Sequence, residues 1–253
     1  KNNDIVKIQI VRKPLSLDLI RKKLDGIKLT KQDFNQIVWD IVNNKLSDVE
    51  LAYFVAACYT NVLSTRETID LIKAMVKYGD RLKIKSYPLI DKHCIGGIPG
   101  NRTTMIIVPI IAAAGYTIPK TSSRSITSPS GTADTMEVFS PVSFPISKMK
   151  SIINKAKGCI IWGGSLNLAP ADDKIINVEK PLEIDAESQL LASIMAKKYS
   201  VSSSHILIDI PVGTDAKVKN KKKALDMKKK FEMIGKKLGK KIKVILTDGS
   251  QPV

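Results

Sequence analysis

The clearest structural signal in this chain lies at residues 91–104, Asp91-Lys92-His93-Cys94-Ile95-Gly96-Gly97-Ile98-Pro99-Gly100-Asn101-Arg102-Thr103-Thr104. The apolar pair at 89–90 predicts a strand before it, and the apolar run at 103–114 predicts a helix after it. Glycines let backbone amides approach an anion closely, a helix start presents unpaired amides, and Lys92 adds a positive charge. The segment is therefore either an anion-binding loop or a tight turn that the glycines allow, and local chemistry leaves both open.

Short apolar runs alternate with helix-length segments through the rest of the chain. The strand-like runs are 159–162, 206–210 and 244–246, and the helix-length segments are 103–114, 148–156 and 221–238. This alternation predicts an α/β domain with a mostly parallel sheet over residues 81–253. The chain begins at Lys1 rather than Met and stops just after a strand-like run, so we expect a truncated fragment whose α/β domain is incomplete at the C-terminus.

Residues 1–80 predict a small all-helical subdomain instead. Three hydroxyl residues each precede a carboxylate by three positions, the spacing of a capping box: Thr30 with Asp33, Ser47 with Glu50, and Ser64 with Glu67. Helices are expected to follow at 31–42, 48–63 and 65–77, after an earlier one at 17–24 that Gly26 ends. Residues 171–200 make a further excursion that ends in a helix at 186–198, and periodicity leaves open whether this excursion rejoins the helical subdomain.

The composition indicates a soluble, cytoplasmic protein. The 253 residues include no apolar run long enough to span a bilayer and no signal peptide, so no membrane partner is expected. Cys58, Cys94 and Cys159 lack the spacing of a disulfide framework or a zinc site. His93 and His205 are the only histidines, which excludes a His-rich metal site. His205 lies at the start of an apolar strand, whereas His93 is expected inside the glycine loop, ordering the backbone or contacting substrate.

The net charge of +17 indicates an anionic partner, which could be nucleic acid, acidic lipid or a phosphorylated small molecule. Much of the excess lies at 217–243, where lysines surround apolar residues at three-to-four-residue spacing. That pattern is typical of a solvated helix with one buried face. It favours this reading over a nucleic-acid surface, because the run contains one aromatic residue and no known nucleic-acid module.

A second polar cluster occupies residues 121–134. It contains eight hydroxyl residues and Arg124, and so supplies neutral donors plus one bidentate ligand for phosphate. The alternative is a solvated loop that ends in a helix cap near Thr132. The two clusters together favour a site for a phosphorylated sugar more strongly than either does alone.

Five motifs in this order resemble the thymidine phosphorylase superfamily: Asp91-Lys92-His93 with Gly96-Gly97, Ser123-Arg124, Ser130-Gly131-Thr132, Leu168-Ala169-Pro170-Ala171-Asp172, and Ser193-Ile194-Met195-Ala196-Lys197-Lys198. Within it, residues 96–101, 123–128 and 179–185 resemble the AMP phosphorylase branch. This branch implies phosphorolysis of nucleoside 5′-monophosphates (AMP, with CMP and UMP as further substrates) to free base and ribose 1,5-bisphosphate. The resemblance further implies inorganic phosphate as co-substrate, no metal or organic cofactor, no nucleic-acid partner, and a homodimer or higher homo-oligomer.

The resemblance also implies roles for individual residues. Asp185 would donate a proton to the departing base, for which burial or a nearby anion must raise its pKa, although it could instead cap a helix beginning at 186. The implied nucleotide and phosphate contacts are Gly97, Ser123, Arg124, Ser125, Ile126, Thr127, Ser128, Thr132, Ser193 and Lys217, with Lys92, His93 and Lys197 as additional candidates.

Three details qualify this assignment. Lys217 lies in a lysine-rich segment, where surface charge is the simpler reading, and Cys94 replaces the serine that the family usually has. Pyrimidine nucleoside phosphorylases carry an arginine within the stretch corresponding to 177–181, where this chain has only Lys180. The alternatives are therefore a pyrimidine nucleoside (thymidine) phosphorylase, a magnesium-dependent phosphoribosyltransferase and a non-catalytic, basic nucleic-acid-binding module.

Overall fold

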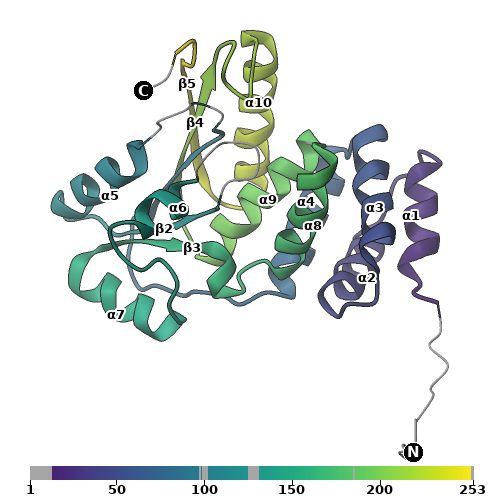
Figure 1. Cartoon of the computed structure of the whole chain (residues 1–253), viewed down its shortest axis with the longest axis horizontal. Coiled ribbons are helices and arrows are strands. Elements are labelled where there is room, and N and C mark those ends of the chain that lie inside the picture. The colour runs from purple at the N-terminus through teal and green to yellow at the C-terminus, as the bar shows by residue number, and fades with distance from the viewer. Residues whose placement is uncertain (1–12, 97, 99–101, 125–130, 185, 252–253) are drawn as a thin grey trace, which may run out of the picture.

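Two groups of helices that are distant in sequence form one bundle at one side of the molecule (Figure 1). The computed structural model describes residues 13–96, 98, 102–124, 131–184 and 186–251. The first group is α1 (Ser16–Leu24), α2 (Lys31–Val42), α3 (Asp48–Thr60) and α4 (Thr65–Lys77). The second group is α8 (Pro170–Leu182) and α9 (Glu187–Ser200), which pack against α3 and α4.

The three predicted capping boxes are confirmed. The side chains of Thr30, Ser47 and Ser64 each accept a hydrogen bond from the amide three residues on, and the carboxylate there accepts one in return. Helix α3 ends at Thr60, earlier than the predicted 63, because Leu63 leaves the helix to pack in the core and donates its amide to Ser188 Oγ.

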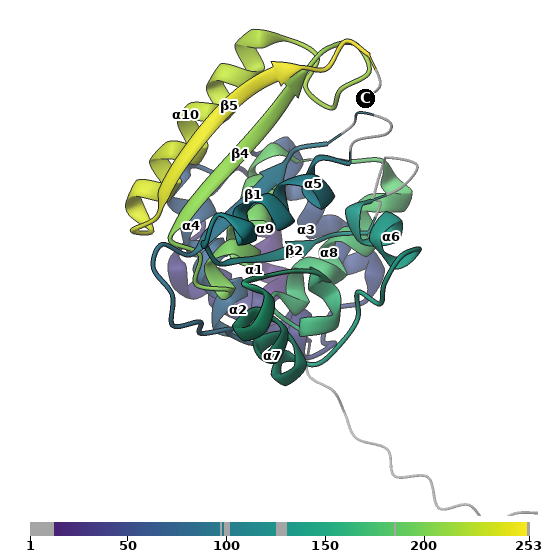
Figure 2. The same ribbon diagram turned by 90° about the vertical axis from the view of Figure 1, so that its left-hand side faces the viewer.

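Five parallel strands in the described residues, in a three-stranded sheet and a two-stranded sheet, form the second layer, and Figure 2 labels four of them. They are β1 (Ile90–Cys94), β2 (Ile118–Ser122), β3 (Gly158–Trp162), β4 (His205–Val212) and β5 (Lys241–Asp248). Strand β4 pairs with β1 and β5, and β2 pairs with β3. A parallel bridge between Leu89 and Thr117 joins β1 to β2, so the spatial order is β3-β2-β1-β4-β5. The predicted fold class, a helical part beside an α/β part with a parallel sheet, is confirmed.

The remaining helices connect or cover these strands: α5 (Thr103–Ala113), α6 (Thr132–Glu137), α7 (Ile146–Ala156) and α10 (Lys221–Lys237). As expected from its apolar spacing, α10 buries Ala224, Met227, Phe231 and Ile234 and leaves most of its lysines exposed. A short 3-10 turn spans Gly163–Leu166. No helix in the described ranges combines the length and apolarity that crossing a membrane requires.

Two elements and one residue correct the sequence reading. Strand β2 was not predicted, because its sequence Ile-Pro-Lys-Thr-Ser mixes polar and apolar residues although every one of them is buried between β1 and β3. Helix α8 was not predicted either. His93 lies on β1 rather than in the glycine loop, because pairing with β4 extends the strand as far as Cys94.

Candidate active site

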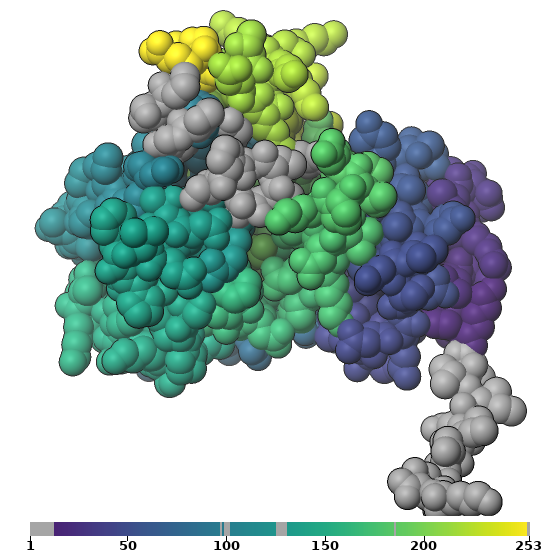
Figure 3. Space-filling view, viewed as in Figure 1, coloured from purple at the N-terminus to yellow at the C-terminus, as the bar shows by residue number. Residues whose placement is uncertain are grey.

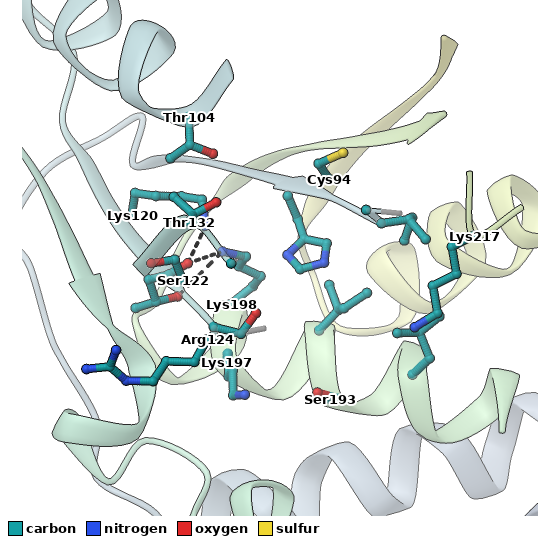
Figure 4. A pocket seen from close by; sticks show the side chains of 18 of the residues that line it. Cys94, Thr104, Lys120, Ser122, Arg124, Thr132, Ser193, Lys197, Lys198 and Lys217 are labelled. Atoms are coloured by element: carbon teal, nitrogen blue, oxygen red, sulfur yellow. Dashed lines mark hydrogen bonds between the residues drawn. The ribbon is translucent and has the colours of Figure 1, made fainter. Parts of the chain in front are cut away.

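A cavity of about 170 Å³ opens where the carboxyl ends of β1 and β2 face α9. In open α/β sheets, this end of the parallel strands is where ligands bind. Cys94 and Ser122 line it from the strand ends, Thr132 from the start of α6, and Ser193 and Lys197 from α9 (Figure 4). The space-filling view shows the molecule hollowed between α6 and α8 (Figure 3). The cavity thus lies between the α/β layer and the helical bundle.

The ionisable side chains that line this cavity, among the described residues, include several basic groups. None of these lining residues carries a carboxylate, and the basic ones besides His93 are Lys120, Arg124, Lys197, Lys198 and Lys217. A concave surface with one sign of charge concentrates ligands of the opposite sign. The cavity is therefore suited to anions.

Asp91 and Lys198 form a buried ion pair behind the cavity. Their side chains are 0% and 2% exposed, and Lys198 Nζ lies 2.8 Å from Asp91 Oδ1. The same oxygen accepts the Lys92 amide at 2.7 Å, and Asp91 Oδ2 accepts Ser203 Oγ at 3.3 Å. This network fixes the last turn of α9 to the centre of the sheet.

Ser193 and Lys197 lie on one face of α9, as their spacing predicted. Asp172 of α8 holds both, since its Oδ2 accepts Ser193 Oγ at 2.9 Å and Lys197 Nζ at 2.8 Å. Burial lowers the pKa of Lys197, but Asp172 and Asp173 more than offset this effect and the pKa is raised overall. Lys197 is therefore charged at neutral pH.

His93 is neutral for a physical reason. Burial is the largest cause and repulsion from Lys198, Lys120 and Lys92 adds to it, so that the pKa of His93 falls well below its ordinary value. Its imidazole can offer one donor and one acceptor but no charge. Cys94 beside it is a thiol, because burial, with Asp209 next to it, raises its pKa to about 11.

Arg124 is engaged with carboxylates of α6 rather than with the cavity interior. Its NH1 lies 2.9 Å from Asp134 Oδ1 and 2.6 Å from Glu137 Oε2, and its NH2 donates to Glu137 Oε1 at 2.9 Å. The guanidinium also lies 4.7 Å from the centre of the Trp162 ring and points away from Lys197 and Lys198 (Figure 4). The N–H donors of Arg124 that were expected to bind phosphate therefore bind Asp134 and Glu137 in this structure.

The other predicted residues are distributed as follows. Ser123 and Thr132 line the cavity, as does Lys217, whose amide donates to the Gly96 carbonyl at 3.5 Å. Lys92 does not line it, and its Nζ donates to Thr103 Oγ1 at 3.1 Å. The predicted residues that lie outside the described part of the chain are Gly97, Ser125, Ile126, Thr127, Ser128 and Asp185.

The start of α9 bears on the alternative role of Asp185 as a helix cap. This helix begins at Glu187, one residue later than predicted, and Ala186 occupies its N-cap position with no side-chain cap. Within the described ranges, no group of three His, Cys, Asp or Glu residues could hold a metal ion.

Three residues of this site received no role from the sequence: Lys120, and Asp172 and Lys198, which were quoted only as members of two motifs. Lys120 was missed together with its strand. Asp172 could have been found, because Pro170 at the first position and acidic residues in the first turn are signals of a helix start. Lys198 lies one position past the Ser193 and Lys197 face, and only the contact with β1 reveals its partner.

Comparison with known proteins gives a family. The glycosyl transferase family's helical bundle domain matches residues 17–79, and its a/b domain matches residues 86–209. Among solved structures, anthranilate phosphoribosyltransferase from Thermus thermophilus has the same fold, with a TM-score of 0.75 at 17% identity over 93% of this chain and 68% of that chain.

Curated relatives are much more similar in sequence. A protein of Legionella pneumophila (strain Corby), provisionally named thymidine phosphorylase, is 47% identical over 253 residues, which is 100% of this chain and 49% of that protein. AMP phosphorylase from Methanocella arvoryzae is 46% identical over 251 residues, 99% of this chain and 50% of that protein. The chain spans about half the length of these relatives. With both of its domains matched in order, the chain belongs to this glycosyl transferase family, and it is similar to proteins named thymidine phosphorylase and AMP phosphorylase.

Proposed function

We propose that the full-length protein is a pentosyltransferase that cleaves nucleoside 5′-monophosphates, AMP first, with inorganic phosphate. The carbon–nitrogen bond at the sugar's anomeric carbon breaks, a bond to a phosphate oxygen forms, and the base leaves with a proton. The cavity lined by basic side chains and by no described carboxylate carries this proposal. Its two substrates bring two phosphate groups into one site, which requires such a surface.

The transition state of this reaction is positively charged on the sugar and negatively charged on the leaving base. The attacking phosphate must therefore be held close to the anomeric carbon while its charge remains available. Lys197, which is charged, and Ser193 beside it are suited to bind the base or another part of the nucleotide. His93 is neutral, so it can donate a hydrogen bond to phosphate without taking the proton of the phosphate group. The family resemblance supplies Asp185 as proton donor. We propose no metal or organic cofactor for these steps.

The direct test is release of free base from AMP by the full-length protein, with and without phosphate. Adenosine, thymidine, CMP and UMP run alongside as substrates. Phosphate-dependent release from AMP but not from adenosine supports recognition of the 5′-phosphate. The Asp185→Asn variant should fold normally and lose turnover, and unchanged turnover would show that Asp185 is not the proton donor.

A second candidate is a pyrimidine nucleoside phosphorylase. Two observations favour it: the Legionella relative's name, and the pairing of Arg124 with Asp134 and Glu137, which leaves this arginine engaged when a 5′-phosphate would need it. Base release from thymidine or uridine, with none from AMP, would select this candidate. We further propose that the protein works in the cytoplasm as a homodimer or larger homo-oligomer, which sedimentation of the full-length protein tests.

A further inference from the structure

Lys120 is a buried lysine that has no carboxylate partner among the described residues. It lies on β2, is 4% exposed, and its Nζ donates to the main-chain carbonyl of Thr121. The adjacent Lys198 is equally buried but has Asp91 at 2.8 Å. Two buried lysine side chains therefore have one buried carboxylate between them. Removing a charge from water is costly unless an opposite charge replaces the lost solvation.

The groups around Lys120 leave its charge under-compensated. Lys198 of α9 and Lys92 of β1 repel an ammonium at this position, whereas Asp91 of β1 favours it, and Cys94 is a neutral thiol that adds no charge. His93 of β1 adds no charge, because its imidazole is neutral. Burial and the nearby lysines together lower the pKa of Lys120 well below its ordinary value.

Lys120 nevertheless lines the cavity, beside hydroxyl groups that can bind an oxyanion. Thr104, Thr121 and Ser122 also line the cavity, and the close-up shows Lys120 next to Ser122 and Lys198 (Figure 4). An oxyanion in this cavity would supply the charge that the protein lacks. The attraction between opposite charges in a partly dry site is strong enough to shift a proton equilibrium by a pKa unit or more.

We propose that Lys120 is an anion-binding residue whose amine takes up a proton from solvent as an oxyanion enters the cavity. The new bond is the third N–H bond of the ammonium group, and the proton comes from buffer. This inference shares one assumption with the proposed function and rests on it there: the cavity binds an oxyanion. When the site is empty, the neutral amine of Lys120 avoids a buried, unpaired charge. When an oxyanion occupies the site, Lys120 carries a full positive charge.

Calorimetric titration of the full-length protein tests this coupling. Sulfate is the first probe, because it does not titrate near neutral pH, and inorganic phosphate is the second. Titrations at one pH, in buffers with different ionisation enthalpies, give the number of protons taken up. We expect uptake in the wild type that approaches one proton as the pH rises toward about 8 to 9, where ordinary lysines are still charged.

Two substitutions separate charge from proton uptake. Lys120→Arg keeps a permanent charge, so it should bind sulfate without proton uptake. Lys120→Met removes both, so sulfate affinity should fall about tenfold or more, the effect of losing one buried charge contact. Lys221→Met removes an exposed lysine of α10 and should bind and take up protons as the wild type does.

Several outcomes would overturn the proposal. Proton uptake that persists in Lys120→Met would assign it to another group, His93 first. Wild-type sulfate affinity that does not change between pH 7 and 9, a measurement that needs no variant to fold, would also exclude it. Base release from AMP is a separate readout: its absence, with proton uptake intact, removes the proposed function but leaves this inference standing.

Discussion

Asp172 is the residue on which the α9 side of the cavity depends. It is buried and holds both Ser193 and Lys197 through one oxygen, whereas Asp173 is more exposed and lies 3.6 Å from Lys197 Nζ. The Asp172→Asn variant keeps the shape but removes the charge that orients Lys197. We expect kcat/KM for phosphorolysis to fall about tenfold, or roughly 1.4 kcal/mol, mainly through a higher KM.

Asp173→Asn is the matched control for this effect. It removes the same charge from the same turn of α8 but leaves the short contacts of Ser193 and Lys197 intact. Its kcat/KM should stay within about twofold of the wild type. Equal losses in both variants would mean that general charge near the cavity matters, and that Asp172 does not position these side chains.

The burial of Lys120 has a consequence for stability. Its pKa is lower in the folded than in the unfolded state, so between the two values the unfolded chain binds more protons and stability rises with pH. Lys120→Met removes this penalty. We expect the free energy of unfolding in urea to increase by roughly 1–3 kcal/mol near neutral pH.

The difference between Lys120→Met and the wild type should shrink as the pH approaches about 10, where an unfolded lysine also loses its proton. Urea unfolding across this range, with Lys221→Met as the exposed control, measures it. A destabilised Lys120→Met variant at every pH would show that the side chain contributes packing rather than an unfavourable charge.

At the scale of elements, helix α4 is fixed to α1 through one carboxylate. Glu67 completes the capping box with Ser64, and its other oxygen accepts Lys23 Nζ and the Leu29 amide, each at 3.0 Å. The side chains of Glu67 and Lys23 are each 3% exposed. Glu67→Gln should therefore cost about 3–5 kcal/mol, the range for breaking a buried ion pair.

The pH dependence of this contribution has a definite sign. Burial raises the pKa of Glu67, but hydrogen bonds from Ser64, Leu29 and Lys23 outweigh it, so the pKa is lowered. The stabilisation is present above the unfolded value of about 4.3 and is lost as the pH falls through the lower folded value. Acid unfolding of Glu67→Gln should lack this component. Glu50→Gln, at the exposed cap of α3, should lose a smaller component of the same sign, because hydrogen bonds from Ser47 also lower the pKa of Glu50.

The elements differ in how far local sequence determines them. Capping boxes predicted α2, α3 and α4, because a cap involves residues only three positions apart. Strand β2 contains a proline and a lysine, and only its place between β1 and β3 makes it a strand. Strand propensity depends on such context more than helix propensity does. The missing strand is also the reason that Lys120 was not recognised.

At the scale of the whole molecule, the change in the spacing of apolar residues along the sequence predicted the two-layer architecture. No such pattern predicted the site. The ion pair between Asp91 and Lys198 joins residues 107 positions apart, and no local pattern predicts which charges will meet. Arg124 illustrates the limit. Its residue type and its loop were recognised as suited to phosphate, yet Glu137, at the end of the following helix α6, is its partner in the structure.

The whole-molecule charge of +17 allows two explanations for any stabilisation by anions. Specific occupation of the cavity should stabilise the fold by about 2.7 kcal/mol at a concentration 100 times the dissociation constant. Screening of the basic surface, including the exposed lysines of α10, depends instead on ionic strength alone. Thermal unfolding in sulfate and in chloride at matched ionic strength separates the two.

We expect sulfate or phosphate to raise the midpoint of unfolding well above chloride, and Lys120→Met to lose about half or more of that difference while Lys221→Met keeps it. An equal shift in chloride would mean that anions act on the surface charge and that the cavity is not their site. If duplex DNA or RNA also bound, with an affinity that falls steeply with salt and with no base release from any substrate, the lysines of α10 would become the functional surface and the nucleic-acid-binding module would replace the phosphorylase.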